Sequence, residues 1–233
     1  MKETKLKEVQ LKLYDNLCKS NWGEPLKVFI MSQDFINILG QLWDESRSGK
    51  SFTPVIKQIF RAFYECPYDK LKIVIIGQDP YPHLDAADGI AFSCSNKNKT
   101  EASLRFICNE INRTVYPDQE YTVNNDLACW ANQGVLLLNT AFTTQVRKVG
   151  KHYNIWKPFM TYLLDYLSHN EKLIYVFMGR VAAQFEEHVD EETSLRFFLN
   201  HPAYGAYSKK GWDCKDIFNR INELLIKKER IKW

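Results

Sequence analysis

The sequence lacks the features that mark several common classes of protein. No stretch of about 18 consecutive apolar residues occurs. The first 20 residues are charged and amphipathic, unlike the apolar stretch of a signal peptide. No repeat, low-complexity tract or linker rich in Pro, Gly or Ser interrupts the 233 residues. We therefore expect one domain, residues 1–233, without a membrane span and located inside the cell: in the cytoplasm, or in the nucleus if the source is eukaryotic.

Metal and nucleotide motifs are also missing. The cysteines form no C-x-x-C pair and have no histidine at metal-ligand spacing; they are Cys18, Cys66, Cys94, Cys108, Cys129 and Cys214. Neither G-x-x-x-x-G-K-[ST] nor G-x-G-x-x-G is present, which excludes a phosphate-loop nucleotide enzyme. We expect no metal ion and no other cofactor.

The charge balance is mild. A formal net charge of +3 and a pI near 8.4 do not by themselves indicate a nucleic-acid-binding protein. Basic residues do cluster locally, at Arg147, Lys148 and Lys151 and again from Lys209 to Arg220. For either cluster alone, a solvated surface is the favoured interpretation.

Short apolar runs alternate with helical patterns along the chain. Strand-length runs occur at 71–76, 135–138, 173–178 and 195–199. Helical spacing is seen from Glu8 to Cys18, after a capping Ser32, and in four later segments, which follow Thr100 or begin at Ile155, Val181 and Asp216. This order predicts an α/β fold with a central four-stranded parallel sheet flanked by helices on both faces, and a helical N-terminal extension over residues 1–21.

Polar residues follow each predicted strand. In open α/β sheets, ligands bind beyond the carboxyl ends of the strands. Asp79, Asn139, Arg180 and His201 should therefore converge on one edge of the sheet. Pro80 and Pro202 directly follow Asp79 and His201 and stiffen the backbone there, which suits a preorganised site, although loops after strands are often polar without any function.

Several ordered motifs resemble those of the family-one uracil-DNA glycosylases. They are GQDPY at 77–81, GIAFS at 89–93, DLACWANQGVLLLNT at 126–140 and HP at 201–202, and the similarity extends from about Trp22 to Leu225. The resemblance implies hydrolysis of the bond between uracil and deoxyribose in DNA, which leaves free uracil and an abasic site and starts base-excision repair. It also implies that the nucleotide is flipped out of the duplex first.

The resemblance implies a role for each matched residue. Asp79 would orient the attacking water and stabilise an oxocarbenium-like transition state, and a neutral His201 would donate to the uracil oxygen. The uracil site would comprise Gln78, Tyr81, Phe92 and Asn139. Asn139 reads the base edge, Phe92 stacks on the base, and Tyr81 fills the space of a thymine methyl group. Ser103 would hold the DNA backbone.

The sequence departs from the family pattern at several loops. Pro82 replaces the histidine that usually ends the first motif, and His83 follows it. NKNKTEAS replaces the proline-rich run before Ser103, which predicts a less rigid loop. Arg180 and Ala203 stand where the family has serines that hold the DNA backbone, and Arg180 is a candidate phosphate contact by charge.

The largest departure is HPAYGAYSKKGWDC, where Gly205 occupies the position of the leucine that enters the duplex. Tyr204 and Tyr207 are the candidate wedges, with solvated surface tyrosines as an equally weighted alternative. Lys209 and Lys210 would hold phosphates.

Two further questions concern partners. The resemblance implies single- or double-stranded DNA containing uracil as the substrate, and a monomeric enzyme. A DNA-mimicking protein inhibitor is a further partner to consider, and whether it docks on the altered loop stays open. A different class of function, a binding or assembly protein on a glycosylase scaffold, is disfavoured because Asp79, Tyr81, Phe92, Asn139 and His201 are all retained.

Overall fold

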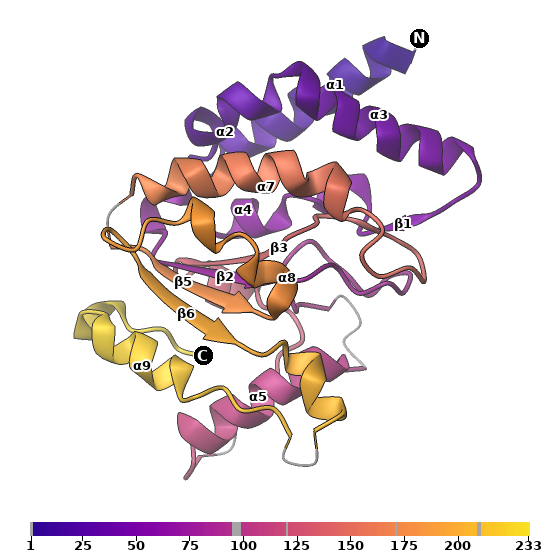
Figure 1. The fold of residues 1–233 in the computed structure, drawn as a ribbon. Helices are drawn as coiled ribbons and strands as arrows, with labels where there is room; N and C mark the ends of the chain where they lie inside the picture. The colour runs from indigo at the N-terminus through magenta and orange to yellow at the C-terminus, as the bar shows by residue number, and fades with distance from the viewer. Residues whose placement is uncertain (1, 95–98, 120, 171, 209–210) are drawn as a thin grey trace.

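A parallel sheet forms the centre of the protein (Figure 1). The computed structural model describes residues 2–94, 99–119, 121–170, 172–208 and 211–233. The four strands of the sheet lie in the order β3-β2-β5-β6. Their bounds are β2 Ile73–Gly77, β3 Val135–Asn139, β5 Ile174–Met178 and β6 Leu195–Leu199. All pairs are parallel, as the alternation of strands and helices predicted.

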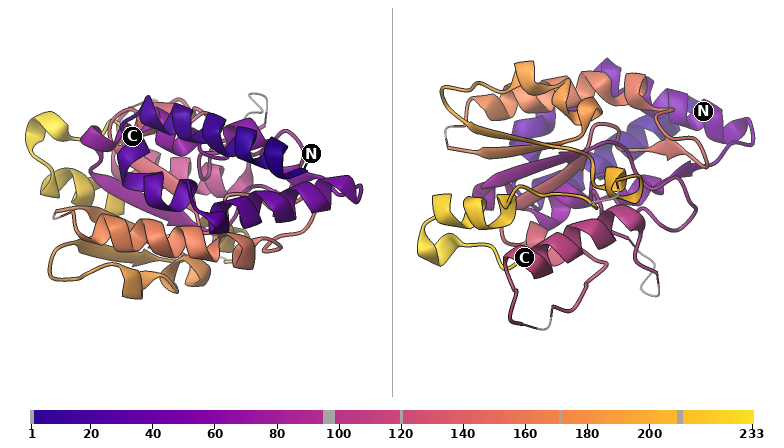
Figure 2. Two further views of the ribbon diagram at one scale, coloured as in Figure 1. Left: turned by 90° about the horizontal axis from the view of Figure 1, so that it is seen from above. Right: turned by 60° about the horizontal axis from the view of Figure 1, so that its bottom comes forward.

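Helices cover both faces of this sheet. The views in Figures 1 and 2 place α1, α2, α3 and α7 on one side and α5 and α9 on the other. The α-helices are α1 Lys2–Cys18, α2 Gly23–Ile30, α3 Gln33–Arg47, α4 Arg61–Glu65, α5 Ala102–Thr114, α6 Ala128–Ala131, α7 Tyr153–Ser168, α8 Arg180–Ala183 and α9 Ile217–Leu224. The 3-10 turns are η1 Ile56–Gln58, η2 Tyr68–Lys70, η3 Glu186–His188, η4 Pro202–Ala206 and η5 Lys227–Glu229.

The strands differ in burial according to their place in the sheet. Every residue of β2 and β5 is buried, because both strands have neighbours on either side and helices above and below. The edge strand β6 is only partly buried: Leu195 is 46% exposed and Phe198 is 39% exposed. The predicted four-stranded parallel sheet with helices on both faces is confirmed, and its edge strand β6 is less covered than the central strands β2 and β5.

Two predicted helices differ in extent from expectation. Ser32 caps α3 as predicted, since its hydroxyl accepts a hydrogen bond from the N–H of Phe35 at 3.3 Å. The helix expected from Val181 ends after one turn, at Ala183. Phe185 and Val189 are both buried, and the chain reaches these two core positions through the tight turn η3 instead of a continuous helix.

The first helix packs against the rest of the fold. Leu6, Leu13 and Leu17 of α1 belong to the hydrophobic core, and Nε2 of Gln10 donates a 2.7 Å hydrogen bond to the carbonyl of Ile30 at the end of α2. These contacts attach residues 2–18 firmly to α2 and α3. No helix in the described ranges is both long and apolar enough to cross a membrane.

A small second sheet connects two loops near the carboxyl ends of the main strands. Strands β1 (Phe52–Thr53) and β4 (Thr144–Gln145) pair in antiparallel fashion. The polar run after β3 is thereby fixed against the segment that leads into α4. This pairing sets the position of residues 146–151, which border the site described next.

Candidate active site

The polar residues predicted to converge do line one cavity. A cavity of about 470 Å³ lies at the carboxyl ends of β2, β3 and β6. Asp79, Asn139 and His201 all line it, although they are far apart in the chain. The remaining lining residues include Gln78, Tyr81, Phe92, Ser103, Val149 and Tyr207. Arg180, also predicted at this edge, is exposed and does not line the cavity.

Asp79 is held by a loop from a distant part of the chain. The N–H of Gly150 donates a 2.7 Å hydrogen bond to Oδ2, and the hydroxyl of Tyr153 lies 3.5 Å from Oδ1. Burial raises the pKa of the Asp79 carboxyl, and the hydrogen bond from Gly150 acts in the opposite direction. The carboxylate is therefore partly desolvated but fixed in orientation, as a group that stabilises developing positive charge needs to be.

His83 does not take the place of the missing family histidine. Its side chain is exposed and lies outside the cavity, whereas Pro82 lines it. The carbonyl of Pro82 accepts a 2.8 Å hydrogen bond from the N–H of Arg147, so this position now anchors the 146–151 loop. The nearby His152 is buried and occupied elsewhere, with Nε2 3.0 Å from Oε2 of Glu45.

His201 is neutral and has a defined tautomer. Burial lowers the pKa of the His201 imidazole to about 4. Nδ1 accepts a 3.2 Å hydrogen bond from the N–H of Ala203, so the proton resides on Nε2. Gly179 makes room for this histidine: its φ is +97°, and a Cβ there would lie 2.9 Å from Cβ of His201. The imidazole can therefore donate from Nε2 without carrying a charge.

Asn139 and Phe92 are packed together around a glycine. Gly77 pairs with Asn139 in the sheet, and a Cβ on Gly77 would lie 2.7 Å from Oδ1 of Asn139 and 2.8 Å from the Phe92 ring. Only glycine fits this contact. Phe92 has a positive φ of 66°, and its ring centroid lies 5.9 Å from that of His201. An aromatic face, an amide and an imidazole thus surround one space that a flat heterocycle can fill.

Tyr81 and Gln78 complete this wall. The hydroxyl of Tyr81 donates a 3.0 Å hydrogen bond to the carbonyl of Phe92, which fixes the ring beside the stacking residue. Burial raises the pKa of the Tyr81 hydroxyl, so it stays protonated. The carbonyl of Gln78 accepts a 2.6 Å hydrogen bond from the Thr140 hydroxyl, tying the end of β2 to the end of β3.

An ionic network beneath the Phe92 turn was not foreseen from the sequence. Arg61 lies 2.8 Å from carboxylate oxygens of both Asp88 and Asp126. Asp88 is only 1% exposed, and it also accepts hydrogen bonds from the Ser93 hydroxyl (2.7 Å) and the Ile90 N–H (3.1 Å). The network holds both ends of the 88–93 turn. The one signal of this network in the sequence was the carboxylate of Asp88, directly before Gly89, for which the motif gave no role.

The predicted DNA-contact residues occupy different environments. Gly205 is buried, and a Cβ there would lie 2.8 Å from the Phe106 ring, so this position offers no side chain to a duplex. Tyr204 is 57% exposed, and Tyr207 is 87% exposed and lines the cavity as well. Lys209, Lys210 and the first part of the NKNKTEAS segment, whose lower rigidity was predicted, lie outside the described residues.

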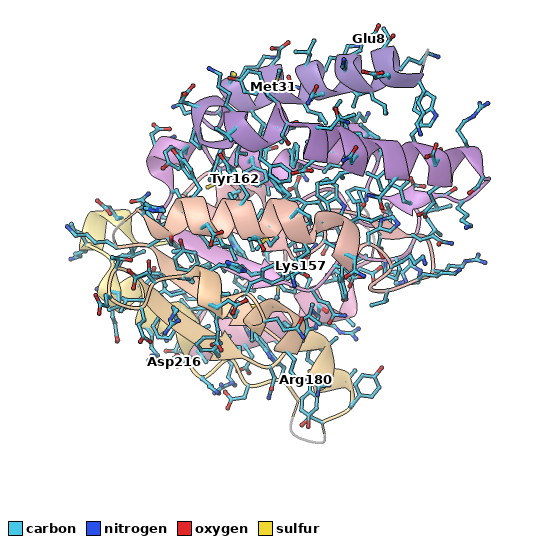
Figure 3. All side chains as sticks on the ribbon, turned by 45° about the horizontal axis from the view of Figure 1, so that its top comes forward. Glu8, Met31, Lys157, Tyr162, Arg180 and Asp216 are labelled. Atoms are coloured by element: carbon cyan, nitrogen blue, oxygen red, sulfur yellow. The ribbon has the colours of Figure 1, made fainter. Side chains whose placement is uncertain are left out.

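Ser103 and Arg180 lie at helix starts. Ser103 is in the first turn of α5, only 6% exposed, and lines the cavity. Arg180 begins α8 directly after Gly179, where an added Cβ would meet His201. Its side chain is exposed (Figure 3) and forms no ion pair within the described part of the chain.

Comparisons with known proteins identify the family of this chain. Residues 63–225 match the model of the uracil DNA glycosylase superfamily. A uracil-DNA glycosylase of Dichelobacter nodosus is 36% identical over 222 residues, which cover 92% of this chain and 94% of that protein. One of Francisella philomiragia is 32% identical over 216 residues, covering 90% and 96%.

A solved structure shows the same fold. The crystal structure of mimivirus uracil-DNA glycosylase superposes with a TM-score of 0.79 at 26% identity, covering 91% of this chain and 84% of that one. A variant of the viral enzyme, solved in complex with UGI, gives a TM-score of 0.80 at 26% identity, with 91% and 87% covered.

The fold and the family match are thus those of a DNA glycosylase, an enzyme that cuts the bond between a base and its deoxyribose. Within that class, the chain belongs to the uracil-DNA glycosylase family, whose members excise uracil in DNA repair. The resemblance stated from the sequence motifs is confirmed.

Proposed function

We propose that Asp79 and His201 hydrolyse the N-glycosidic bond of uracil in DNA from opposite sides of the cavity. The observation that carries this proposal is their placement, with Asn139, around one cavity. Asp79 orients a water molecule for attack at C1′ and stabilises the positive charge that develops on the sugar. As the bond to N1 breaks, the electron pair passes to the uracil ring, where His201 donates a hydrogen bond from Nε2 to the oxygen that gains negative charge. The proton that the attacking water loses passes to solvent, from which the departing uracil anion is protonated.

The neutral state of His201 suits this step. A charged imidazole at this position would incur a desolvation penalty, and for this reason burial lowers the pKa of His201 to about 4. The Ala203 N–H on Nδ1 fixes the donor at Nε2. A preorganised neutral donor stabilises the uracil anion without rearranging during the reaction.

Selection of uracil rests on three further side chains. Asn139 accepts from one position of the base edge and donates to another, while cytosine presents the reverse pattern and leaves polar groups unpaired. Phe92 stacks on the base, and Tyr81 excludes the methyl group of thymine. The close packing of Gly77 against Asn139 and Phe92 supports this assignment, since it restricts both side chains. Gln78, which also lines the cavity, completes the uracil site.

Contacts with the DNA come from the rim of the cavity. Ser103 and Arg180 hold backbone phosphates, the first by its hydroxyl and the second by its charge. Of the two candidate wedges, Tyr207 is supported better than Tyr204, because it is more exposed and lines the cavity. Gly205 serves as the close-packed base of this turn. Lys209 and Lys210, which follow this turn in the sequence, supply additional positive charge toward the DNA.

We extend the proposal to organisation and partners. The substrate is uracil in single- or double-stranded DNA, and the enzyme acts as a monomer in the cytoplasm of a bacterium, consistent with its bacterial relatives. The chain works as one unit to which residues 1–21 add a helix. Because the related viral enzyme was solved with UGI, an inhibitor of that kind is a candidate partner at the same rim.

The test is direct. A uracil-containing oligonucleotide is incubated with the protein without added metal or cofactor, and abasic sites are then cleaved with alkali. We expect strand breaks with the wild type, and a loss of at least about 100-fold in rate for Asp79→Asn and for His201→Ala. Unchanged rates in both folded variants would refute the assignment. A wild type without breaks on any DNA would instead favour a binding role.

A further inference from the structure

Residues 146–151 form a loop of defined structure at the mouth of the cavity, and hydrogen bonds that involve its backbone fix it to neighbouring segments. The N–H of Arg147 donates to Pro82, the hydroxyl of Thr144 donates to the carbonyl of Lys148 at 2.6 Å, and the N–H of Gly150 donates to Asp79. Arg147 adopts a positive φ of 65° within this loop. A backbone held in this way presents its side chains at fixed positions.

The tip of the loop is apolar and exposed. Val149 lines the cavity, yet it is 60% exposed. A single exposed valine is unremarkable on a protein surface, but this one borders the catalytic cavity and is held by the same turn that orients Asp79. Tyr207, 87% exposed, lines the same cavity from the η4 side. Two exposed apolar side chains from distant segments therefore share the mouth.

Cations flank this tip. Arg147, Lys148 and Lys151 are exposed, and none has an ion pair with any described residue. Lys50 and His83 lie beside Arg147 around an adjoining depression. Of the carboxylates near the loop, Asp79 accepts the Gly150 N–H inside the cavity, and Asp85, two residues after His83, is exposed. Positive charge around an apolar tip matches a nucleic-acid strand, whose phosphates lie outside its stacked bases.

We propose that residues 146–151 are a second DNA-binding arm, in which Val149 packs against a nucleotide two positions away from the flipped one while Arg147 and Lys148 contact the phosphates there. This inference rests on the proposed function, because the strand must enter the same cavity. The arm is distinct from the η4 turn and from Ser103, and it acts on DNA that extends beyond the flipped nucleotide. A trinucleotide with uracil at its centre ends at the immediate neighbours and therefore does not reach the arm.

The experiment compares substrates of two lengths. Excision is measured on a uracil trinucleotide and on a long single strand with Val149→Ser, Arg147→Gln and the control Lys12→Gln. Lys12 is exposed on α1 and outside the cavity. We expect Val149→Ser to lower kcat/KM on the long strand by about fivefold and to leave the trinucleotide unchanged, since serine loses the apolar contact with the base.

Binding provides a second readout that is independent of cleavage. For a long strand without uracil, we expect Arg147→Gln to reduce the slope of log K against log salt by about 0.7, the value for one phosphate contact on a single strand, while Lys12→Gln leaves it unchanged. Equal losses of kcat/KM on both substrate lengths in Val149→Ser, or an unchanged salt slope in Arg147→Gln, would refute the DNA-binding arm. A wild type that cleaves neither substrate would count against the proposed function, while the salt slopes would still decide for or against the arm.

Discussion

The backbone N–H of Ala203 donates a hydrogen bond to Nδ1 of His201 across a single residue. Ala203 stands where the family has a serine, and the contact uses only its main chain. The substitution therefore removes a hydroxyl without disturbing the histidine's tautomer. His201, Pro202 and Ala203 together form a local unit that presents Nε2 to the cavity, and it leads to the first prediction.

Replacing His201 should change how stability depends on pH. In the folded protein, burial lowers the pKa of His201 to about 4, whereas an unfolded histidine titrates near 6.5. Below about pH 6.5 this histidine becomes protonated in the unfolded chain but stays neutral in the folded chain. It therefore makes the free energy of unfolding fall as the pH drops toward 4. We expect His201→Gln to lose less stability than the wild type between pH 7 and 4.5 in urea unfolding. Parallel losses in the two proteins would contradict a buried neutral imidazole.

Tyr153→Phe should shift the acid limb of the pH–rate profile. The hydroxyl of Tyr153 lies 3.5 Å from Oδ1 of Asp79. Removing this donor destabilises the carboxylate and raises the pKa of Asp79 further, so activity should be lost at a higher pH as the medium is acidified. At neutral pH we expect kcat to fall about fivefold, as for the loss of one long, weak hydrogen bond.

The matched control for this change is Tyr162→Phe. The hydroxyl of Tyr162 donates a 3.0 Å hydrogen bond to the carbonyl of Pro25, and the residue does not line the cavity. It should lose comparable stability without any shift of the profile. An identical profile in both variants would show that Tyr153 does not act on Asp79.

Tyr207→Ala should slow uracil excision from duplex DNA more than from single strands. A wedge compensates for base unstacking, which costs a few kcal/mol in a duplex and much less in a single strand. We expect a loss of about tenfold or more on the duplex and less than about threefold on the single strand. Tyr204→Ala is the comparison, since Tyr204 is exposed but does not line the cavity. Equal losses on both substrates would argue against a wedge.

Asp88→Ala should destabilise the protein strongly. Asp88 is 1% exposed, and its loss removes one partner of Arg61 together with the hydrogen bonds to Ser93 and Ile90. We expect the free energy of unfolding to fall by about 3 kcal/mol, as when one partner of a buried ion pair is removed. KM for uracil-DNA should rise because the Phe92 turn loses its support.

Asp126→Ala tests whether burial explains the large loss of stability expected for Asp88→Ala. Its side chain is 47% exposed and bonds to the same arginine. An exposed partner of this kind should contribute about 1 kcal/mol or less. If the two variants unfold at the same denaturant concentration, the buried position of Asp88 is not what makes it important.

Local patterns in the sequence were enough to place most elements of the fold. Apolar runs of strand length are visible in the sequence because β2 and β5 are buried on both faces, and their alternation with helical spacing requires parallel pairing. β6 was also located, but its exposed edge was missed, since strand order depends on packing between distant segments. The short segments α4, α6 and β1 were not predicted, because they have too few residues to show a period.

For the site, the sequence by itself determined the residue types and the edge of the sheet to which they belong. Asp79, Asn139 and His201 each follow a strand, and parallel strands bring their carboxyl ends to one edge. The tertiary structure alone decided what orients them: Gly150 and Tyr153 on Asp79, the Ala203 N–H on His201, and Arg61 beneath the Phe92 turn. Except for the Ala203 contact, these pairs join residues distant along the chain, and the hydrogen bonds and ion pairs between them exist only once the sheet and its loops have closed around the cavity.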